Sequence, residues 1–108
     1  MQSVQSEYCT HRQATAFDAT VNSGIYAACD SAQIEQGTDW SDENIEKHGA
    51  RKLLRMTCDI DACHEAYGRL LEENLVPDCE VELGNEKLNL RHLIDDAHAH
   101  CTIHRRLG

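Results

Sequence analysis

Six cysteines in a chain of 108 residues are the feature that most restricts how this protein can fold. An even number of cysteines in a short chain is typical of disulfide-stabilised proteins of oxidising compartments, and a cytosolic protein with six buried thiols is the alternative. Three disulfides would each stabilise the fold by about 2–4 kcal/mol, which helps a small apolar core. The chain has no Cys-x-x-Cys pair, so a structural zinc site is poorly supported. We therefore expect a secreted, extracellular protein.

The spacing of Cys58 and Cys63 indicates how the cysteines are shared among the elements. Residues five positions apart on a helix point in different directions, so these two cysteines should bond to two other elements. Cys79 follows Pro77, which ends a helix, and begins the next element. The segment from Cys58 to Cys79 is therefore the part of the chain to which the other elements should be tied.

Hydrophobic periodicity predicts an all-α protein of five to six helices with one small two-stranded β-hairpin. Apolar residues recur at helical spacing in five stretches, and Gly37 and Pro77 each end one of them. After Pro77, apolar and polar residues alternate over 81–83 and 88–90, which predicts the hairpin. We expect a flexible N-terminal segment over 1–8, a single domain over 9–108, and helices over 9–22, 25–36, 41–58, 60–74 and 91–104.

Charge and motifs exclude several classes of function. The net charge of −9 argues against nucleic acid and against an anionic membrane surface as partners. No apolar run is long enough to serve as a transmembrane segment. A Gly-x-Ser-x-Gly nucleophile motif and a glycine-rich phosphate loop are absent, and every cysteine has a structural role to fill. We therefore predict that the protein is not an enzyme and carries no cofactor.

The last predicted helix offers a minor alternative, which is metal binding. His92, Asp96, His100 and His104 are spaced four residues apart, so they form one stripe on a helix. Imidazoles one turn apart can share a zinc or copper ion. The same stripe is also compatible with a histidine-rich, solvated outer face, which is the interpretation that we favour.

The cysteine pattern, together with the N-terminal motif, resembles the elicitins and elicitin-like proteins that oomycetes secrete. Cys58 and Cys63 are five positions apart, Cys79 follows a proline, and Cys101 lies in the last helix. The stretch Cys9-Thr10-His11-Arg12-Gln13-Ala14-Thr15-Ala16 is similar to the Cys-Thr-x-x-Gln-x-Thr-Ala opening of that family, and Leu88-Asn89-Leu90 is similar to its second hairpin strand. The resemblance covers residues 9–101, nearly the whole chain.

The resemblance implies a helical domain in which a hairpin and a loop close a hydrophobic cavity. Sequence alone allows fifteen ways to pair six cysteines. The family pattern implies one of them, with bonds Cys9–Cys79, Cys29–Cys63 and Cys58–Cys101. It also implies a partner that is a sterol or fatty-acid-like lipid, movement of lipids between membranes, and a plant or other protein receptor through which such proteins elicit plant defence, including the hypersensitive response.

Two departures from the family pattern concern the cavity. Sterol-carrying elicitins place tyrosines around it, but this chain has Leu54 and Leu93 at two of those positions. Leucine keeps the apolar area and loses the hydroxyl. The loop between Cys29 and Cys58 is also longer and more acidic than is usual in the family. We predict that an apolar cavity persists, with a ligand-binding wall formed by Leu53, Leu54, Met56, Tyr67, Leu70, Leu71, Leu83, Leu88 and Leu90; a filled core made of the same residues is the alternative.

An interaction function is the main alternative to lipid binding. In that hypothesis the protein is a secreted effector module with no lipid carriage, and a partner recognises its acidic surface and Trp40. The acidic residues concerned are Glu35, Asp39, Asp42 and Glu43. We favour Trp40 as a plug over the core rather than as a partner contact.

Overall fold

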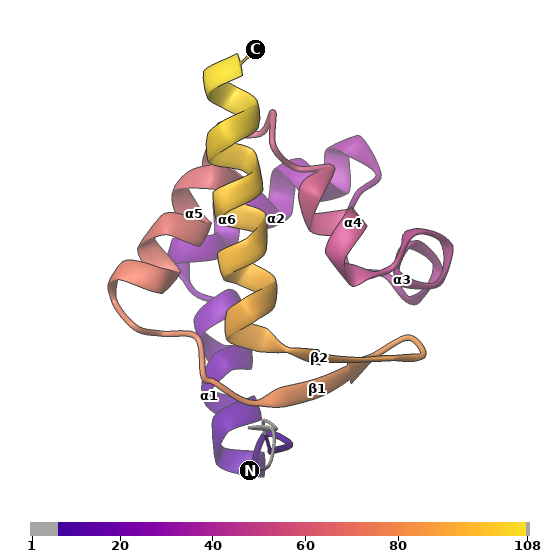
Figure 1. The fold of residues 1–108 in the computed structure, drawn as a ribbon, viewed down its shortest axis with the longest axis vertical. Helices are drawn as coiled ribbons and strands as arrows, with labels where there is room; N and C mark the ends of the chain where they lie inside the picture. The colour runs from indigo at the N-terminus through magenta and orange to yellow at the C-terminus, as the bar shows by residue number, and fades with distance from the viewer. Residues whose placement is uncertain (1–6, 108) are drawn as a thin grey trace, which may run out of the picture.

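The computed structural model describes residues 7–107, which form six α-helices and a two-stranded antiparallel hairpin. The predicted fold class is therefore confirmed. Figure 1 shows α6 rising from the hairpin to the C-terminus, with α5 on one side of it, α4 and α3 on the other, α2 crossing behind it, and α1 near the hairpin. The elements are α1 (His11–Val21), α2 (Gly24–Gln36), α3 (Asp42–His48), α4 (Ala50–Arg55), α5 (Asp61–Glu72), β1 (Glu80–Leu83), β2 (Glu86–Asn89) and α6 (Leu90–Leu107).

Three disulfides tie these elements together, and no cysteine is free. Cys58 and Cys63 do bond to two different elements, as their spacing predicted. Cys63 on α5 bonds to α2, and Cys58 in the α4–α5 loop bonds to α6. The third bond joins the segment before α1 to the segment before β1. The pairing Cys9–Cys79, Cys29–Cys63 and Cys58–Cys101 is the one that the family resemblance implied.

Local sequence signals explain where most helices begin and end. The Thr10 side chain accepts from the Gln13 backbone N–H, and the Gln13 side chain accepts from the Thr10 N–H, which is a complete capping box for α1. Gly37 ends α2 in the left-handed conformation that glycine adopts readily. Ser41 caps α3 through the N–H of Asn44.

The single helix predicted over 41–58 is instead two short helices, because Gly49 interrupts it. Gly49 has φ 81° and ψ 152°, a conformation essentially limited to glycine. Figure 1 shows that the break turns α3 away from the axis of α4. This places α3 beside the hairpin, where the Ile45 side chain approaches Gly84.

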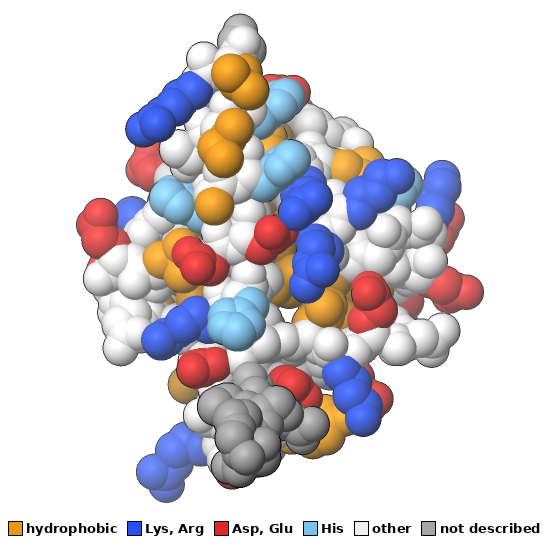
Figure 2. Space-filling view, in the orientation of Figure 1, with side chains coloured by type: hydrophobic (Ala, Val, Ile, Leu, Met, Phe, Trp, Pro, Cys, Tyr) orange, Lys and Arg blue, Asp and Glu red, His pale blue; other side chains and the backbone are white. Residues whose placement is uncertain are grey.

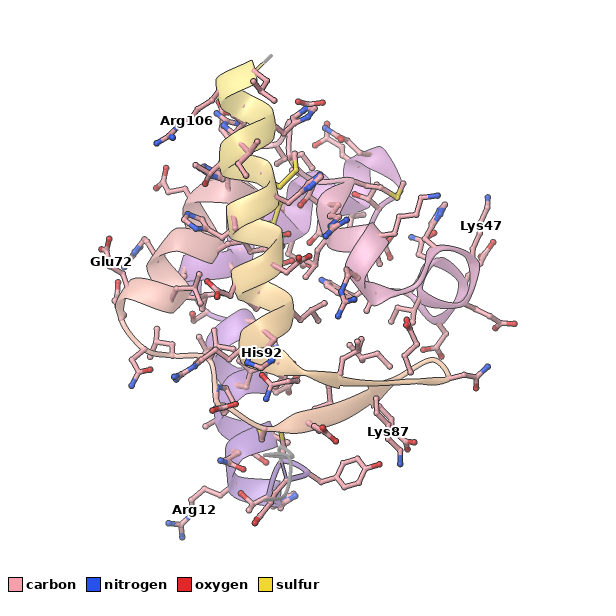
Figure 3. All side chains as sticks on the ribbon, in the orientation of Figure 1. Arg12, Lys47, Glu72, Lys87, His92 and Arg106 are labelled. Atoms are coloured by element: carbon pink, nitrogen blue, oxygen red, sulfur yellow. A yellow bond between two sulfur atoms is a disulfide. The ribbon has the colours of Figure 1, made fainter. Side chains whose placement is uncertain are left out.

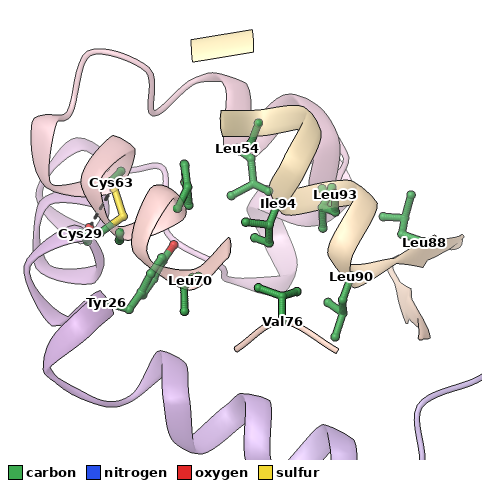
Figure 4. Packing of buried hydrophobic residues seen from close by; sticks show 14 of the residues in the cluster. Tyr26, Cys29, Leu54, Cys63, Leu70, Val76, Leu88, Leu90, Leu93 and Ile94 are labelled. Carbon is green, nitrogen blue, oxygen red and sulfur yellow. Dashed lines mark hydrogen bonds between the residues drawn. A yellow bond between two sulfur atoms is a disulfide. The ribbon is translucent and has the colours of Figure 1, made fainter. Parts of the chain in front are cut away.

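The fully buried core lies between α2, α4, α5 and α6. The Cys29–Cys63 disulfide has no exposed surface, and Tyr26 and Leu70 pack near it (Figure 4). Tyr67 on α5 is fully buried, and its hydroxyl is 2.8 Å from the Thr57 hydroxyl. Burial, and then the nearby Tyr26, raise the pKa of Tyr67, so it stays a neutral core residue.

The hairpin is hydrogen-bonded to the segment that precedes α1. Val81 pairs with Leu88 across the two strands. The N–H of Cys9 donates to the carbonyl of Glu80 at 2.9 Å, and the Glu80 N–H donates to the carbonyl of Glu7 at 2.8 Å. Of the segment predicted to be flexible over 1–8, residues 1–6 lie outside the described residues, whereas Glu7 and Tyr8 run beside β1.

Two histidines stack where α5 meets α6. The rings of His64 and His98 have centroids 5.0 Å apart and planes inclined by 13°. His64 Nε2 also lies 3.0 Å from the Thr102 hydroxyl. Burial, followed by the charges of His98 and Arg105, lowers the pKa of His64. The packed interface therefore favours the neutral ring.

Candidate ligand-binding cavity

A cavity of about 510 Å³ lies between the helices and the hairpin. All the helices and one hairpin strand contribute to its wall, together with the loop that carries Trp40. Hydrophobic side chains are visible in a hollow between α4, α6 and the hairpin in Figure 2. The lining residues are Ala14, Phe17, Asp18, Val21, Asn22, Tyr26, Asp30, Trp40, Asp42, Ile45, Leu54, Leu70, Val81, Leu83, Leu90, Leu93 and Ile94.

Helical spacing explains which side chains reach the cavity. On α1, Ala14, Phe17 and Val21 lie one turn apart and face it as one stripe. On α2, Tyr26 and Asp30 are one turn apart and line it together. None of the residues of α1, all of which the structure describes, is fully buried. Phe17 and Val21 are partly buried against the core, and the same apolar face of α1 lines the cavity.

The α6 helix and the hairpin form the opposite part of the wall. Leu90, Leu93 and Ile94 lie on consecutive turns of α6 and line the cavity (Figure 4). Val81 and Leu83 are two positions apart on β1, so both point to the same side of the hairpin and into the cavity. A hairpin with one apolar face needs such a surface to lie on.

Four of the nine predicted ligand-binding residues line the cavity: Leu54, Leu70, Leu83 and Leu90. The other five are placed elsewhere. Leu53, Tyr67 and Leu88 are packed inside the protein, Leu71 is partly buried against the core, and Met56 is 39% exposed. Tyr67 shows why a predicted residue can lie outside the cavity. Its hydroxyl has a buried partner in Thr57, and its ring is packed in the core.

Several cavity residues were not among the predicted ones. Phe17 and Val21 belong to the inward stripe of the first predicted helix, and that amphipathic pattern was the signal available for them. Ile45 carried the same kind of signal for α3. Tyr26 and Trp40 carried no such signal, because only the folded chain brings them together.

Tyr26 and Trp40 line the cavity and are joined by hydrogen bonds to the buried Gln33 behind the wall. The Tyr26 hydroxyl donates to Gln33 Oε1, and Trp40 Nε1 donates to the Tyr26 oxygen at 3.1 Å. Gln33 Nε2 donates to the Thr38 carbonyl at 3.0 Å. Burial raises the pKa of Tyr26, the bond from Trp40 partly opposes this, and the charge of Asp30 also raises it. The network holds Trp40 in the cavity wall, where its side chain is partly buried against the core.

Leu54 and Leu93 both face the cavity. Each is almost fully buried. Neither leucine side chain can form a hydrogen bond with a ligand. Among the described residues of the wall, Tyr26 is the only tyrosine.

The histidine stripe of α6 lies along the surface of the helix. Residues 7–107 contain no group of three or more His, Cys, Asp or Glu side chains placed to hold a metal ion. Asp96 is instead paired with Arg55 at 3.0 Å, and His104 Nε2 lies 3.4 Å from Asp59. Figure 3 places His92 at the hairpin end of α6, far from Arg106 at the other end. His92, His100 and His104 are therefore surface residues spread along the helix.

Comparison of the chain with protein-family models, with curated proteins and with solved structures gave no match. Over the described part of the chain, no helix is long and apolar enough to cross a membrane.

Proposed function

We propose that this protein is an elicitin-like lipid-binding protein that takes a sterol or another lipid into the cavity between its helices and hairpin. The observation that carries the proposal is the cavity itself, about 510 Å³ with a largely aliphatic and aromatic wall. Small-molecule sites in proteins typically occupy about 300–1,000 Å³ and have apolar walls with a few polar groups. A single lipid is a suitable occupant for a space of this size.

The surroundings of the cavity support ligand binding rather than a packing defect in the core. The core beside the cavity is closed to solvent, with Leu53 and Tyr67 fully buried. Concave apolar spaces of this size beside a buried core are typical of small-molecule sites, which supports a ligand as the occupant. Three disulfides join elements around the cavity: one links the segments before α1 and β1, one links α2 to α5, and one links the α4–α5 loop to α6.

The cellular setting is part of the same proposal. Three disulfides in a small compact domain are consistent with an extracellular protein. Carriage of lipid outside the cell and recognition by a plant or other receptor follow from the family resemblance, and both are proposed together with it.

A matched pair of α1 variants tests the proposal. Ala14 lines the cavity, whereas Ala19 lies on the same helix, is also exposed, and does not line it. Ala14→Phe should occupy ligand space and weaken binding by about tenfold or more. Ala19→Phe makes the same chemical change outside the cavity and should leave affinity unchanged. Binding is measured by titrating oxidised protein with dehydroergosterol and, separately, with a fluorescent fatty acid, and following the emission of each probe.

Saturable one-to-one uptake by the wild type and by Ala19→Phe, with loss in Ala14→Phe, is the expected result. Equal uptake by all three proteins would place the lipid outside the cavity. No uptake of either probe by folded wild-type protein would refute lipid binding and favour the alternative of partner recognition through the acidic surface.

A further inference from the structure

Three carboxylates line the cavity beside its apolar wall. Asp18, Asp30 and Asp42 come from α1, α2 and α3. All three side chains are exposed to solvent. Within the described residues, none of them forms an ion pair with Lys, Arg or His. The cavity therefore has several unneutralised anionic acceptors within reach of a ligand head group.

Most of the side-chain donors of the wall already form hydrogen bonds within the protein. Asn22 Nδ2 donates to the carbonyl of Asp18 at 2.8 Å. The Tyr26 hydroxyl donates to Gln33, and Trp40 Nε1 donates to Tyr26. For a ligand with an acceptor-only head group, these side chains leave only the second N–H of the Asn22 amide, and any further bond would have to displace one already formed. A ligand with a donor head group would find free carboxylate oxygens.

Basic side chains do not offset this charge inside the cavity, since no Lys, Arg or His is among its lining residues. The basic residues of α4 line a separate groove with Glu86 of the hairpin. Figure 2 shows Lys and Arg side chains gathered over α4 on the outer face. One of them, Arg55, is already paired with Asp96. The chain as a whole carries a net charge of −9.

We propose that the cavity selects an amphiphile with a positively charged, hydrogen-donating head group over one of the same chain length with a carboxylate. This inference rests on the proposed lipid-binding function and specifies its ligand class. The alkyl chain occupies the space between Phe17, Leu54 and Leu93, and the head group faces the carboxylates. An uncharged alcohol, which can donate one hydrogen bond, should rank between the amine and the acid.

The test compares three probes that differ only in the head group: dodecylamine, dodecanol and dodecanoate, each below its micelle-forming concentration. Dissociation constants are measured by calorimetry at pH 7 in low salt. Wild-type protein should bind the amine about tenfold or more tightly than the acid, because charge–charge terms of this kind are strong at low ionic strength. The ratio should shrink in high salt, where exposed charges are screened.

A charge-matched pair of variants separates the cavity carboxylates from the overall charge. Asp18→Asn, Asp30→Asn and Asp42→Asn together should bring the amine-to-acid ratio close to one. The control combines three neutralisations at exposed acids that do not line the cavity, Glu35→Gln, Glu46→Gln and Glu65→Gln, and it makes the same change in net charge. This control should keep most of the wild-type ratio.

The outcomes distinguish this inference from the function on which it rests. Wild-type protein that binds all three probes equally, or binds the acid most tightly, would overturn the selectivity and leave lipid binding in place. An equal loss of selectivity in the two triple variants would assign it to net charge and also overturn the inference. Absence of binding of every probe, and of dehydroergosterol, would overturn both.

Discussion

Replacing the buried Gln33 with leucine should destabilise the protein strongly, because its amide holds two buried partners. Gln33 has no exposed surface, its Oε1 accepts from the Tyr26 hydroxyl, and its Nε2 donates to the Thr38 carbonyl. Leucine has a similar volume and can form neither bond. Each buried polar group that loses its partner costs about 1–3 kcal/mol, so the two together cost about 2–6 kcal/mol. The added apolar burial offsets part of that loss, and we expect a net decrease of about 2 kcal/mol or more in the free energy of unfolding.

Guanidinium denaturation of the oxidised protein, followed by circular dichroism, measures this loss. Gln36→Leu is the matched control, since Gln36 is exposed on the same helix and should change stability by no more than about 0.5 kcal/mol. Gln33→Leu should also shift Trp40 emission, because Tyr26 loses its anchor to Gln33 while it still holds Trp40. If the two leucine variants unfold at the same denaturant concentration, the hydrogen-bond network around the cavity does not stabilise the fold as we argue.

The remaining predictions concern a disulfide, a histidine and two glycines. Removing the bond between Cys58 and Cys101 by double serine substitution frees a loop with a sequence separation of 43 and should cost about 4 kcal/mol, measured by denaturation; a loss below about 1 kcal/mol would contradict this. Because the pKa of His64 is lowered on folding, the unfolded chain binds its proton more tightly, so stability should fall as the pH drops below the ordinary histidine value. Thermal unfolding at several pH values should show a weaker acid dependence in His64→Gln, and an unchanged dependence would refute it. Gly49→Ala forces alanine into a glycine conformation and should cost about 1–3 kcal/mol, whereas Gly24→Ala, with open space around the new methyl group, should stabilise slightly; similar melting temperatures for the two variants would contradict that reasoning.

The helices could be predicted where local chemistry decides them. Thr10 and Ser41 satisfy free N–H groups at helix starts, and Gly37 supplies a left-handed stop, so these boundaries follow from nearby residues. Gly49 is different, because a glycine within a helical pattern is often tolerated and its effect depends on the surroundings. Here the break brings α3 to the hairpin, a tertiary contact that periodicity does not contain.

The cavity could be predicted only in part. Periodicity indicates which face of a helix points inward, so Leu54 and Leu70 were among the candidates. It does not indicate whether the opposing surface fills the space, which is why Tyr67 was expected in the cavity and is in the core. The contact of Trp40 with Tyr26 joins residues 14 positions apart through a loop, and the long-range fold determines it.

Energy transfer from Trp40 to bound dehydroergosterol tests the central claim most directly. Trp40 is the only tryptophan of the chain and lines the cavity, so its emission reports on an occupant at that place. We predict that sterol quenches Trp40 emission and gains emission of its own, both saturating at one sterol per protein. Sterol that binds without energy transfer, or oxidised folded protein that takes up neither sterol nor the fluorescent fatty acid, would contradict the account.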